Sequence, residues 1–290
     1  MHHVIAPVVD AASLETWLHT GRPVTITDVR WYLDGRDGRE AYETAHLPGA
    51  VWIDLDRDLA GHGLPATEGR HPLPTPADFA AAMAVAGIGD DTIVVAYDDT
   101  GGLTAGRLVV MLRMLGRDAA VLNGGLNTWV AEGRAIETGP GRAPTPATFT
   151  AAAWPSERLV SADETAAHAA AGGVVLDARA AERFTGEVTQ IDPRPGHIPG
   201  ARNAPWAAVL GADGRMLPTQ ELLAHYTQLG ATVPEAAPIA YCGSGVSACM
   251  NAIAMEHAGL TPPRMYVASF SGWSADPAHA VETGPGGQVA

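Results

Sequence analysis

The feature that most constrains this chain is an internal duplication. Four short motifs occur twice in the same order, and the two copies of each are 144 to 151 residues apart. Four ordered matches at such similar spacing are not expected by chance, so we predict two copies of one domain. The motifs are Thr-Asp-Val-Arg at 27–30 and Leu-Asp-Ala-Arg at 176–179, His-x-Pro-Gly-Ala at 46–50 and 197–201, Tyr-Asp at 97–98 and Tyr-Cys at 241–242, and Trp129 and Trp273.

The length of the chain agrees with this duplication. Its 290 residues are enough for about two domains of ordinary size. Between the copies, residues 139–146 are rich in glycine and proline, which is typical of a linker. We therefore predict an N-terminal domain over 1–138, a linker over 139–157 and a C-terminal domain over 158–285.

Within each copy, short apolar segments alternate with amphipathic ones. Ser161 followed by Glu164 is the pattern of a capping box at a helix N-terminus. Alternating strands and helices favour an α/β fold, in which each of two tandem domains has a parallel sheet flanked by helices. The predicted strands are 92–96 and 174–176, and the predicted helices are 77–85, 105–115, 162–171, 221–229 and 248–258.

The composition argues against several kinds of partner. The formal net charge is −14 at pH 7, whereas nucleic acids and anionic membranes bind clustered Lys and Arg. No segment reaches the ~18 consecutive apolar residues of a membrane helix, and the N-terminal residues lack the pattern of a signal peptide. We expect a cytoplasmic protein that binds no nucleic acid, no membrane, no metal and no cofactor.

The two cysteines, Cys242 and Cys249, are too few for a secreted disulfide framework. Cys242 begins the segment Cys-Gly-Ser-Gly-Val-Ser-Ala at 242–248, between a predicted strand and a predicted helix. Its two glycines allow a tight loop, and backbone N–H groups of such a loop can converge on one anion. Because this arrangement favours a thiolate, we predict that Cys242 is the catalytic nucleophile. Cys249 lies among apolar residues of the helix and is interpreted as a core residue, with a redox partner for Cys242 as the alternative.

Several repeated residues are interpreted as structural, because they occur also in the copy that lacks the cysteine. His46 and His197 are assigned to turns, and Arg30 and Arg179 to ion pairs. Asp98 stands where the second copy has its cysteine. A carboxylate cannot replace a thiolate as the nucleophile, so the first domain is predicted to be catalytically inactive.

These motifs together resemble the tandem-domain rhodanese family of sulfurtransferases, and the resemblance covers essentially the whole chain. Within that family, Cys-Gly-Ser-Gly-Val at 242–246 is similar to the loop of the 3-mercaptopyruvate sulfurtransferase type. Members that prefer thiosulfate have basic residues at the two positions after the cysteine, where this chain has Gly243 and Ser244. Ser247 stands where the family usually has threonine and keeps the hydroxyl.

The resemblance implies that a serine, a histidine and an aspartate accompany the catalytic Cys242. These match Ser244, His71 and Asp56. From the sequence alone, either of two neighbouring acidic residues could replace Asp56, namely Asp54 and Asp58.

The resemblance also implies that arginines bind the carboxylate of the substrate. One matches Arg183, which has no counterpart in the first copy, and Arg194 is the candidate for the second. The remaining substrate-binding residues are expected in the loop after the cysteine, namely Gly243, Gly245, Val246 and Ser247.

The reaction that the resemblance implies begins with attack of the cysteine thiolate on the sulfur of 3-mercaptopyruvate. A persulfide forms on Cys242 and pyruvate is released. The sulfur then passes to a thiol acceptor such as thioredoxin, or to cyanide. Arginine suits a planar carboxylate, and a hydroxyl–imidazole–carboxylate set can move the protons.

The sequence also bears on three other functions. Cysteine phosphatases need an arginine six residues after the cysteine, where this chain has Ala248. A non-catalytic binding module would not need the intact cysteine loop. Thiosulfate sulfurtransferase is the serious alternative, because family members often accept both sulfur donors.

Overall fold

A computed structural model describes residues 5–188, 191–232 and 237–286. The chain forms two compact units, which we call the first and the second unit. The first unit consists of Met1–Gly61, Pro74–Trp154 and Leu210–Met216. The second consists of His62–Leu73, Pro155–Val209 and Leu217–Ala290. Each unit thus contains one short segment that comes from the part of the sequence that mainly builds the other.

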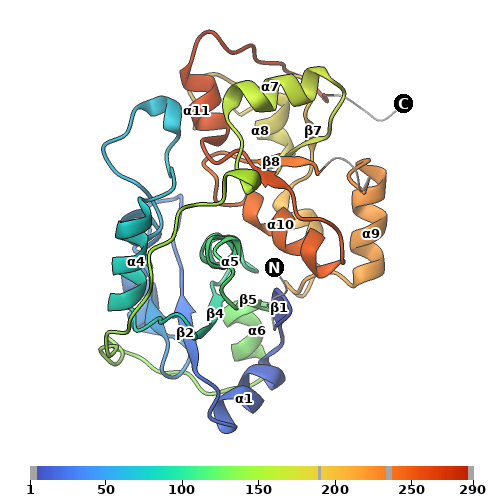
Figure 1. Ribbon diagram of the computed structural model, residues 1–290. Helices are drawn as coiled ribbons and strands as arrows, with labels where there is room; N and C mark the ends of the chain where they lie inside the picture. Colours follow the sequence, from blue (N-terminus) through green and yellow to red (C-terminus); the bar gives the residue numbers. More distant parts are fainter. Residues whose placement is uncertain (1–4, 189–190, 233–236, 287–290) are drawn as a thin grey trace. The chain divides into compact units, whose positions relative to one another are not determined.

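The first unit is built on a parallel sheet of five strands (Figure 1). Its order is β1-β5-β4-β2-β3, and every pairing within it is parallel. Valine, isoleucine and alanine dominate the central strands, as expected for strands covered on both faces. The strands are β1 (Val8–Val9), β2 (Val24–Asp28), β3 (Val51–Trp52), β4 (Ile93–Tyr97) and β5 (Ala119–Leu122).

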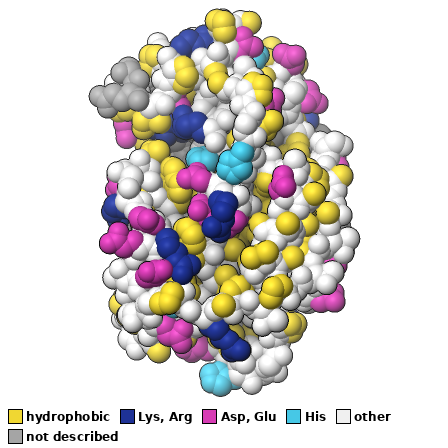
Figure 2. Space-filling model, turned by 90° about the vertical axis from the view of Figure 1, so that its left-hand side faces the viewer, with side chains coloured by type: hydrophobic (Ala, Val, Ile, Leu, Met, Phe, Trp, Pro, Cys, Tyr) yellow, Lys and Arg dark blue, Asp and Glu magenta, His cyan; other side chains and the backbone are white. Residues whose placement is uncertain are grey.

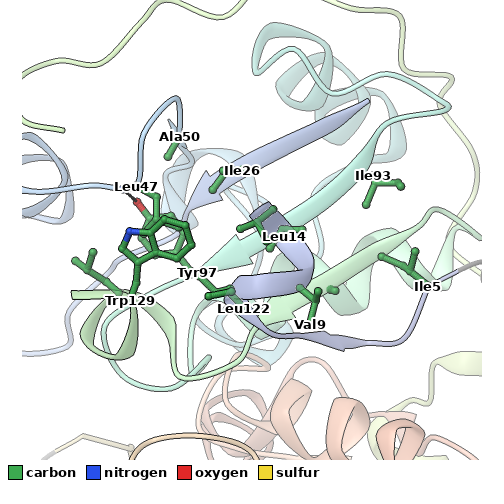
Figure 3. Close-up of a cluster of buried hydrophobic side chains, with 14 of the residues drawn as sticks. Ile5, Val9, Leu14, Ile26, Leu47, Ala50, Ile93, Tyr97, Leu122 and Trp129 are labelled. Carbon is green, nitrogen blue, oxygen red and sulfur yellow. Dashed lines mark hydrogen bonds between the residues drawn. The ribbon is translucent and has the colours of Figure 1, made fainter. Parts of the chain in front are cut away.

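Helices cover this sheet because successive strand residues point to opposite faces. Ile93, Val95 and Tyr97 belong to the cluster that also contains buried residues of α1, α2 and α6, whereas α5 contacts β4 and β5 without contributing to that cluster. Figure 3 shows Leu14, Tyr97 and Trp129 among the side chains of this cluster. The helices are α1 (Ala11–His19), α2 (Gly38–Thr44), α3 (Leu55–Asp58), α4 (Pro76–Val85), α5 (Ala105–Met114) and α6 (Gly125–Ala131).

The second unit repeats this plan with a parallel sheet of order β7-β6-β8-β9. Read from the other edge, this is the order β5-β4-β2-β3 of the first unit. An isolated parallel bridge from Leu159 to Met265 takes the place of the pairing between β1 and β5. The strands are β6 (Val175–Asp177), β7 (Arg202–Asn203), β8 (Ile239–Tyr241) and β9 (Arg264–Met265).

The helices of the second unit correspond to those of the first. The capping box predicted at Ser161 and Glu164 is present at the start of α7. Predicted helices and strands in both units agree with the observed ones to within about two residues, and the predicted parallel sheets are confirmed. The helices are α7 (Ala162–Ala170), α8 (Ala181–Thr185), α9 (Thr219–Gln228), α10 (Ala248–His257) and α11 (Ser269–Ala275), with short 3-10 turns at η1 (Ala66–Glu68), η2 (Ser156–Arg158) and η3 (Trp206–Val209).

The repeated Asp-x-Arg motifs form one buried ion pair in each unit. Arg30 bonds to Asp28 at 2.7 Å, and Arg179 to Asp177 at 2.6 Å. Burial opposes the charge on Arg179, but Asp177 outweighs this effect, and the pKa of Arg179 is raised. The structural interpretation of both arginines is confirmed.

The repeated histidines also have matching surroundings. His46 Nδ1 lies 2.8 Å from the carbonyl oxygen of Tyr42, and its ring stacks on Tyr42. His197 makes the same contacts with Phe184. Both rings are fully buried, so their predicted structural role is confirmed.

In the part of the chain that the structure describes, no helix is both long and apolar enough to cross a membrane. On the face drawn in Figure 2, acidic and basic side chains are intermixed. Positive charge is therefore not segregated into one extended patch on that face.

Candidate functional site

Cys242 is held where β8 meets the first turn of α11. Its backbone N–H donates to Ser269 Oγ at 3.1 Å, and its carbonyl accepts the N–H of Phe270 at 2.9 Å. The next carbonyl, of Gly243, accepts the N–H of Ser271 at 2.9 Å. These three bonds hold the backbone of Cys242 and Gly243 in place. The cysteine side chain is buried.

The segment from Cys242 to Ala248, which we call the Cys242 loop, leaves several backbone donors available. Gly245 has φ +78°, which its lack of a side chain permits, and its N–H points at the cysteine Sγ at 3.1 Å. None of the described residues accepts a hydrogen bond from the backbone N–H of Ser244, Val246 or Ala248. Such a ring of N–H groups can bind an anion on or beside the sulfur.

The remaining loop residues have smaller parts in this geometry. Val246 is buried, and Ser247 occupies the N-cap position of α10 without a side-chain cap bond. Gly243 has an ordinary φ, so a glycine is favoured there by the lack of room for a side chain and not by the backbone conformation. Cys249 is buried in α10 with Sγ 3.5 Å from the carbonyl oxygen of Gly245, which confirms its interpretation as a core residue.

Ser269 is a residue of this site that the sequence did not reveal. It has φ +54°, the one positive value outside glycine in the described ranges. Its hydroxyl donates to the carbonyl of Tyr266 at 3.0 Å, and lies 4.0 Å from the cysteine Sγ. Left-handed backbone at a non-glycine residue is costly and tends to occur at functional sites. The signal for it is the equivalent residue of the first unit, which is Gly125 at φ +57°.

Ser244 and His71 are brought together, as predicted. His71 Nδ1 lies 2.8 Å from Ser244 Oγ, and the histidine is 7% exposed. The short segment 62–73 belongs to the second unit. It is tied there by the backbone N–H of Arg70, which donates to Ser271 Oγ at 3.1 Å. The imidazole and the hydroxyl can therefore exchange a proton beside the Cys242 loop.

Asp56 lies in α3 of the first unit, between its two acidic alternatives, Asp54 and Asp58. Asp54 caps α3 by accepting the N–H of Asp56, and Asp58 is paired with Arg57 at 2.7 Å. Both alternatives are thus used to build the helix. The Asp56 carboxylate instead accepts the indole N–H of Trp31 at 2.8 Å.

Two arginines lie against the residue that follows the cysteine. An added side-chain carbon on Gly243 would lie 2.8 Å from Arg183 Nη2 and 3.0 Å from Arg70 Nη2. Asp192 bridges both arginines, with 2.6 Å to Arg183 and 2.8 Å to Arg70. The predicted place of Arg183 beside the cysteine loop is therefore matched by a second arginine, Arg70, that sequence reasoning missed.

Asp192 is largely buried, and burial by itself opposes ionisation of a carboxylate. The charges of Arg183 and Arg70 outweigh this effect, so the pKa of Asp192 lies below its usual value. The Asp192 carboxylate is therefore ionised at neutral pH, and it compensates one of the two guanidinium charges beside the Cys242 loop.

Arg194 occupies a different place from the one that the sequence suggested. Its guanidinium donates to four backbone carbonyls at the C-terminal end of α11, whereas the Cys242 loop contacts the N-terminal end of that helix. Arginine is favourable at a helix C-terminus because it satisfies the last carbonyls. The expectation that Arg194 reaches a substrate carboxylate is not supported by this geometry. The four carbonyls belong to Trp273, Ser274, Asp276 and His279.

The described residues contain no group of three or more His, Cys, Asp or Glu side chains arranged to hold a metal ion. The donors around the Cys242 loop are backbone N–H groups, hydroxyls, an imidazole and guanidinium groups. Such a set suits an anionic organic substrate and a sulfur nucleophile.

Comparison with known proteins identifies the family of this chain. The model of the rhodanese-like domain matches residues 10–132 and again 161–276. A probable 3-mercaptopyruvate sulfurtransferase from Pseudomonas aeruginosa is 41% identical over 89% of this chain and 92% of its own length. A putative thiosulfate sulfurtransferase, SseB, from Mycobacterium tuberculosis is 39% identical over 96% of this chain and 97% of its own.

A solved structure is similar over nearly the whole chain. The 3-mercaptopyruvate sulfurtransferase from Leishmania major superposes with a TM-score of 0.82 and 32% identity, and covers 94% of this chain and 75% of its own. The two matched regions, and relatives that match over most of their own length, agree with the duplicated sequence. This chain belongs to the rhodanese family, as a tandem-domain sulfurtransferase.

Proposed function

We propose that this protein transfers sulfur from 3-mercaptopyruvate to a thiol or to cyanide through a persulfide on Cys242. The observation that carries the proposal is the Cys242 loop. Its thiol is followed by backbone N–H groups without an acceptor among the described residues, by Ser244 bonded to His71, and by Gly243, against which two guanidinium groups lie. The loop has no basic residue of its own, in keeping with a carboxylate donor.

The proposed step conserves atoms and electrons. The Cys242 thiolate attacks the donor sulfur, the carbon–sulfur bond breaks, and its electron pair goes to carbon as the enolate of pyruvate. The thiol proton of the donor balances the proton that the enolate carbon takes up. The loop N–H groups stabilise the negative charge on the cysteine sulfur.

Ser244, His71 and Asp56 are proposed to move the proton. The Ser244–His71 bond of 2.8 Å supports the first link. Asp56 is proposed for the third place because Asp54 and Asp58 are used in α3. In hydrolase triads, a carboxylate in the third place orients the imidazole and stabilises its charged form.

Donor binding is assigned to Arg183 and to the Cys242 loop. The guanidinium of Arg183 lies over Gly243, so it can hold a donor carboxylate while the donor sulfur faces the thiol. Gly245, Val246 and Ser247 are proposed to line the same site with their backbone N–H groups.

Thiosulfate is the second candidate donor. It is favoured by the Mycobacterium tuberculosis relative, whose name refers to thiosulfate. The sulfur acceptor is proposed to be a small thiol or a dithiol protein such as thioredoxin, since exchange with a persulfide needs an accessible thiolate. Such chemistry needs a reduced cysteine, so the proposed location is the cytoplasm.

The test is intact-mass analysis after incubation with each donor. We expect one added sulfur atom on the wild type and on Cys249→Ser, and none on Cys242→Ser. Steady-state rates should give a higher kcat/KM for 3-mercaptopyruvate than for thiosulfate. No adduct with either donor would refute the persulfide route, and the reverse ranking would make thiosulfate the donor.

A further inference from the structure

A cluster of one acid and three arginines lies beside the Cys242 loop in the second unit. Asp192 is 7% exposed and contacts Arg70, Arg179 and Arg183 at 2.8, 3.3 and 2.6 Å. Arg179 is already neutralised by Asp177 at 2.6 Å. The charges that remain are therefore Arg70 and Arg183 against Asp192, a net charge of plus one.

The two arginines keep donors that Asp192 does not use. Arg70 reaches Asp192 with Nη1 while its Nη2 lies at Gly243. Arg183 Nη1 also lies at Gly243, and its buried Nε has no hydrogen-bond partner among the described residues. A buried donor without a partner is unfavourable in a finished structure and indicates a place for a ligand oxygen.

Asp192 thus acts on the two arginines in two ways. It fixes their planar groups beside the residue that follows the cysteine, and it removes one of their two charges. A carboxylate donor with a protonated thiol carries one negative charge and balances the remaining positive charge. Thiosulfate carries two, so one negative charge would be left uncompensated in a partly buried site, which is unfavourable.

We propose that Arg70 binds the sulfur donor together with Arg183, and that Asp192 is the specificity-determining residue that adapts this arginine pair to singly charged donors. The inference rests on the proposed function and names what selects its substrate.

The test uses variants that change the net charge of the cluster stepwise. Asp192→Asn keeps the size of the side chain and leaves plus two. Arg70→Gln leaves zero, and the double variant returns to plus one. The ratio of kcat/KM for thiosulfate to that for 3-mercaptopyruvate should rise about tenfold in Asp192→Asn, as expected for one charge in a partly buried site.

The other two variants keep the proposal testable even where one of them folds poorly. In Arg70→Gln the ratio should fall, with KM rising for both donors more than kcat falls. In the double variant the ratio should return to the wild-type value while both rates stay reduced. A purely structural role for Asp192 would lower both rates equally and leave the ratio unchanged, which would overturn the proposal.

Asp163→Asn is the matched control, because it removes the same charge from α7 at a fully exposed position. Its donor ratio should stay at the wild-type value because exposed charges are screened. A wild type that takes sulfur from neither donor would refute the proposed function itself. A wild type that works with a donor ratio insensitive to Asp192→Asn would refute only the present inference.

Discussion

The loop after β4 in the first unit and the equivalent loop after β8 in the second unit are built in opposite ways. In the first unit, the buried carboxylate of Asp98 fills the loop that follows β4. One of its oxygens accepts the N–H groups of Thr100 and Gly102 at 2.8 Å each. The other accepts those of Thr104 at 2.8 Å and Ala105 at 3.0 Å. The anion that this loop binds is part of the chain.

In the second unit, the residue at the same place is Cys242, whose sulfur accepts a hydrogen bond from the N–H of Gly245. The donors two, four and six residues further on, which Asp98 occupies in the first unit, have no acceptor among the described residues. The comparison indicates that the loop is an anion site in both units. A carboxylate closes it, whereas a thiol leaves it available for charge that arises during a reaction.

The largest expected effect is the loss of stability when the Asp98 carboxylate is removed from the loop of the first unit. Asp98→Ala would leave four N–H groups of the first unit, three of them buried, without their acceptor. We expect a loss of about 3 kcal/mol or more in the free energy of unfolding. The matched change Cys242→Ala removes one bond to sulfur and should cost about 1 kcal/mol while abolishing sulfur transfer. Urea unfolding, with hydrogen exchange of segments 98–106 and 242–250, measures both.

Asp98→Asn is the control, because it keeps one carbonyl oxygen as acceptor and should fall between Asp98→Ala and the wild type. Equal stability losses for Asp98→Ala and Cys242→Ala would mean that the carboxylate does not hold its loop as the bonds indicate. The contrast between a filled and an open loop would then be wrong.

Local patterns made much of the fold predictable. The alternation of apolar and amphipathic segments, the Asp-x-Arg pairs and the capping box at Ser161 each depend on residues close in sequence, and all are present. The duplication predicted two domains of the same architecture, because each motif occurs at the same place in both copies. Cys242 was predictable from its glycine-rich loop between a strand and a helix, whereas Ser244 and Arg183 were predicted from the family resemblance.

Contacts between distant segments were not predictable from such patterns. Arg70 precedes His71 by one residue, yet its place depends on the packing of 62–73 against α11 and on Asp192. Arg194 was expected near the substrate because of its position in the chain, but the end of α11 offers it four carbonyls. The strain at Ser269 arises from a backbone turn that glycine forms without cost in the first unit.

Ser269 provides a second, smaller test of the contrast between the units. Ser269→Ala removes the hydroxyl that accepts the N–H of Cys242, and we expect kcat/KM to fall about tenfold, the effect of one hydrogen bond at a reacting centre. Ser269→Gly copies Gly125 of the first unit. It should lose the same activity but be about 1 kcal/mol more stable than Ser269→Ala, because glycine adopts positive φ without strain.

Steady-state kinetics and urea unfolding of the two variants separate these effects. Wild-type kcat/KM in Ser269→Ala would remove the hydroxyl from the mechanism. A glycine variant no more stable than the alanine variant would show that the left-handed conformation at 269 is not strained.

The smallest expected effect is a loss of stability of the second unit at acidic pH. Burial disfavours the charged imidazole and lowers the pKa of His197 from 6.5, and burial acts in the same direction on three other histidines of the second unit. Below pH about 6.5 the unfolded chain therefore binds more protons than the folded one. Stability that is fully present above pH 6.5 should be lost progressively as the pH falls toward the lowered pKa values of the folded state. The three other histidines with lowered pKa values are His168, His225 and His257.

Hydrogen exchange of the second unit at pH 7.5 and 5.5, corrected for intrinsic rates, checks the predicted direction of the stability change. The urea midpoint should fall on acidification, and His197→Gln should reduce the fall, because glutamine can donate to the carbonyl of Phe184 but does not titrate. A midpoint that rises between pH 7.5 and 5.5 would contradict the sign. It would mean that Glu282, 3.8 Å from the other ring nitrogen, stabilises the charged imidazole by more than burial opposes it.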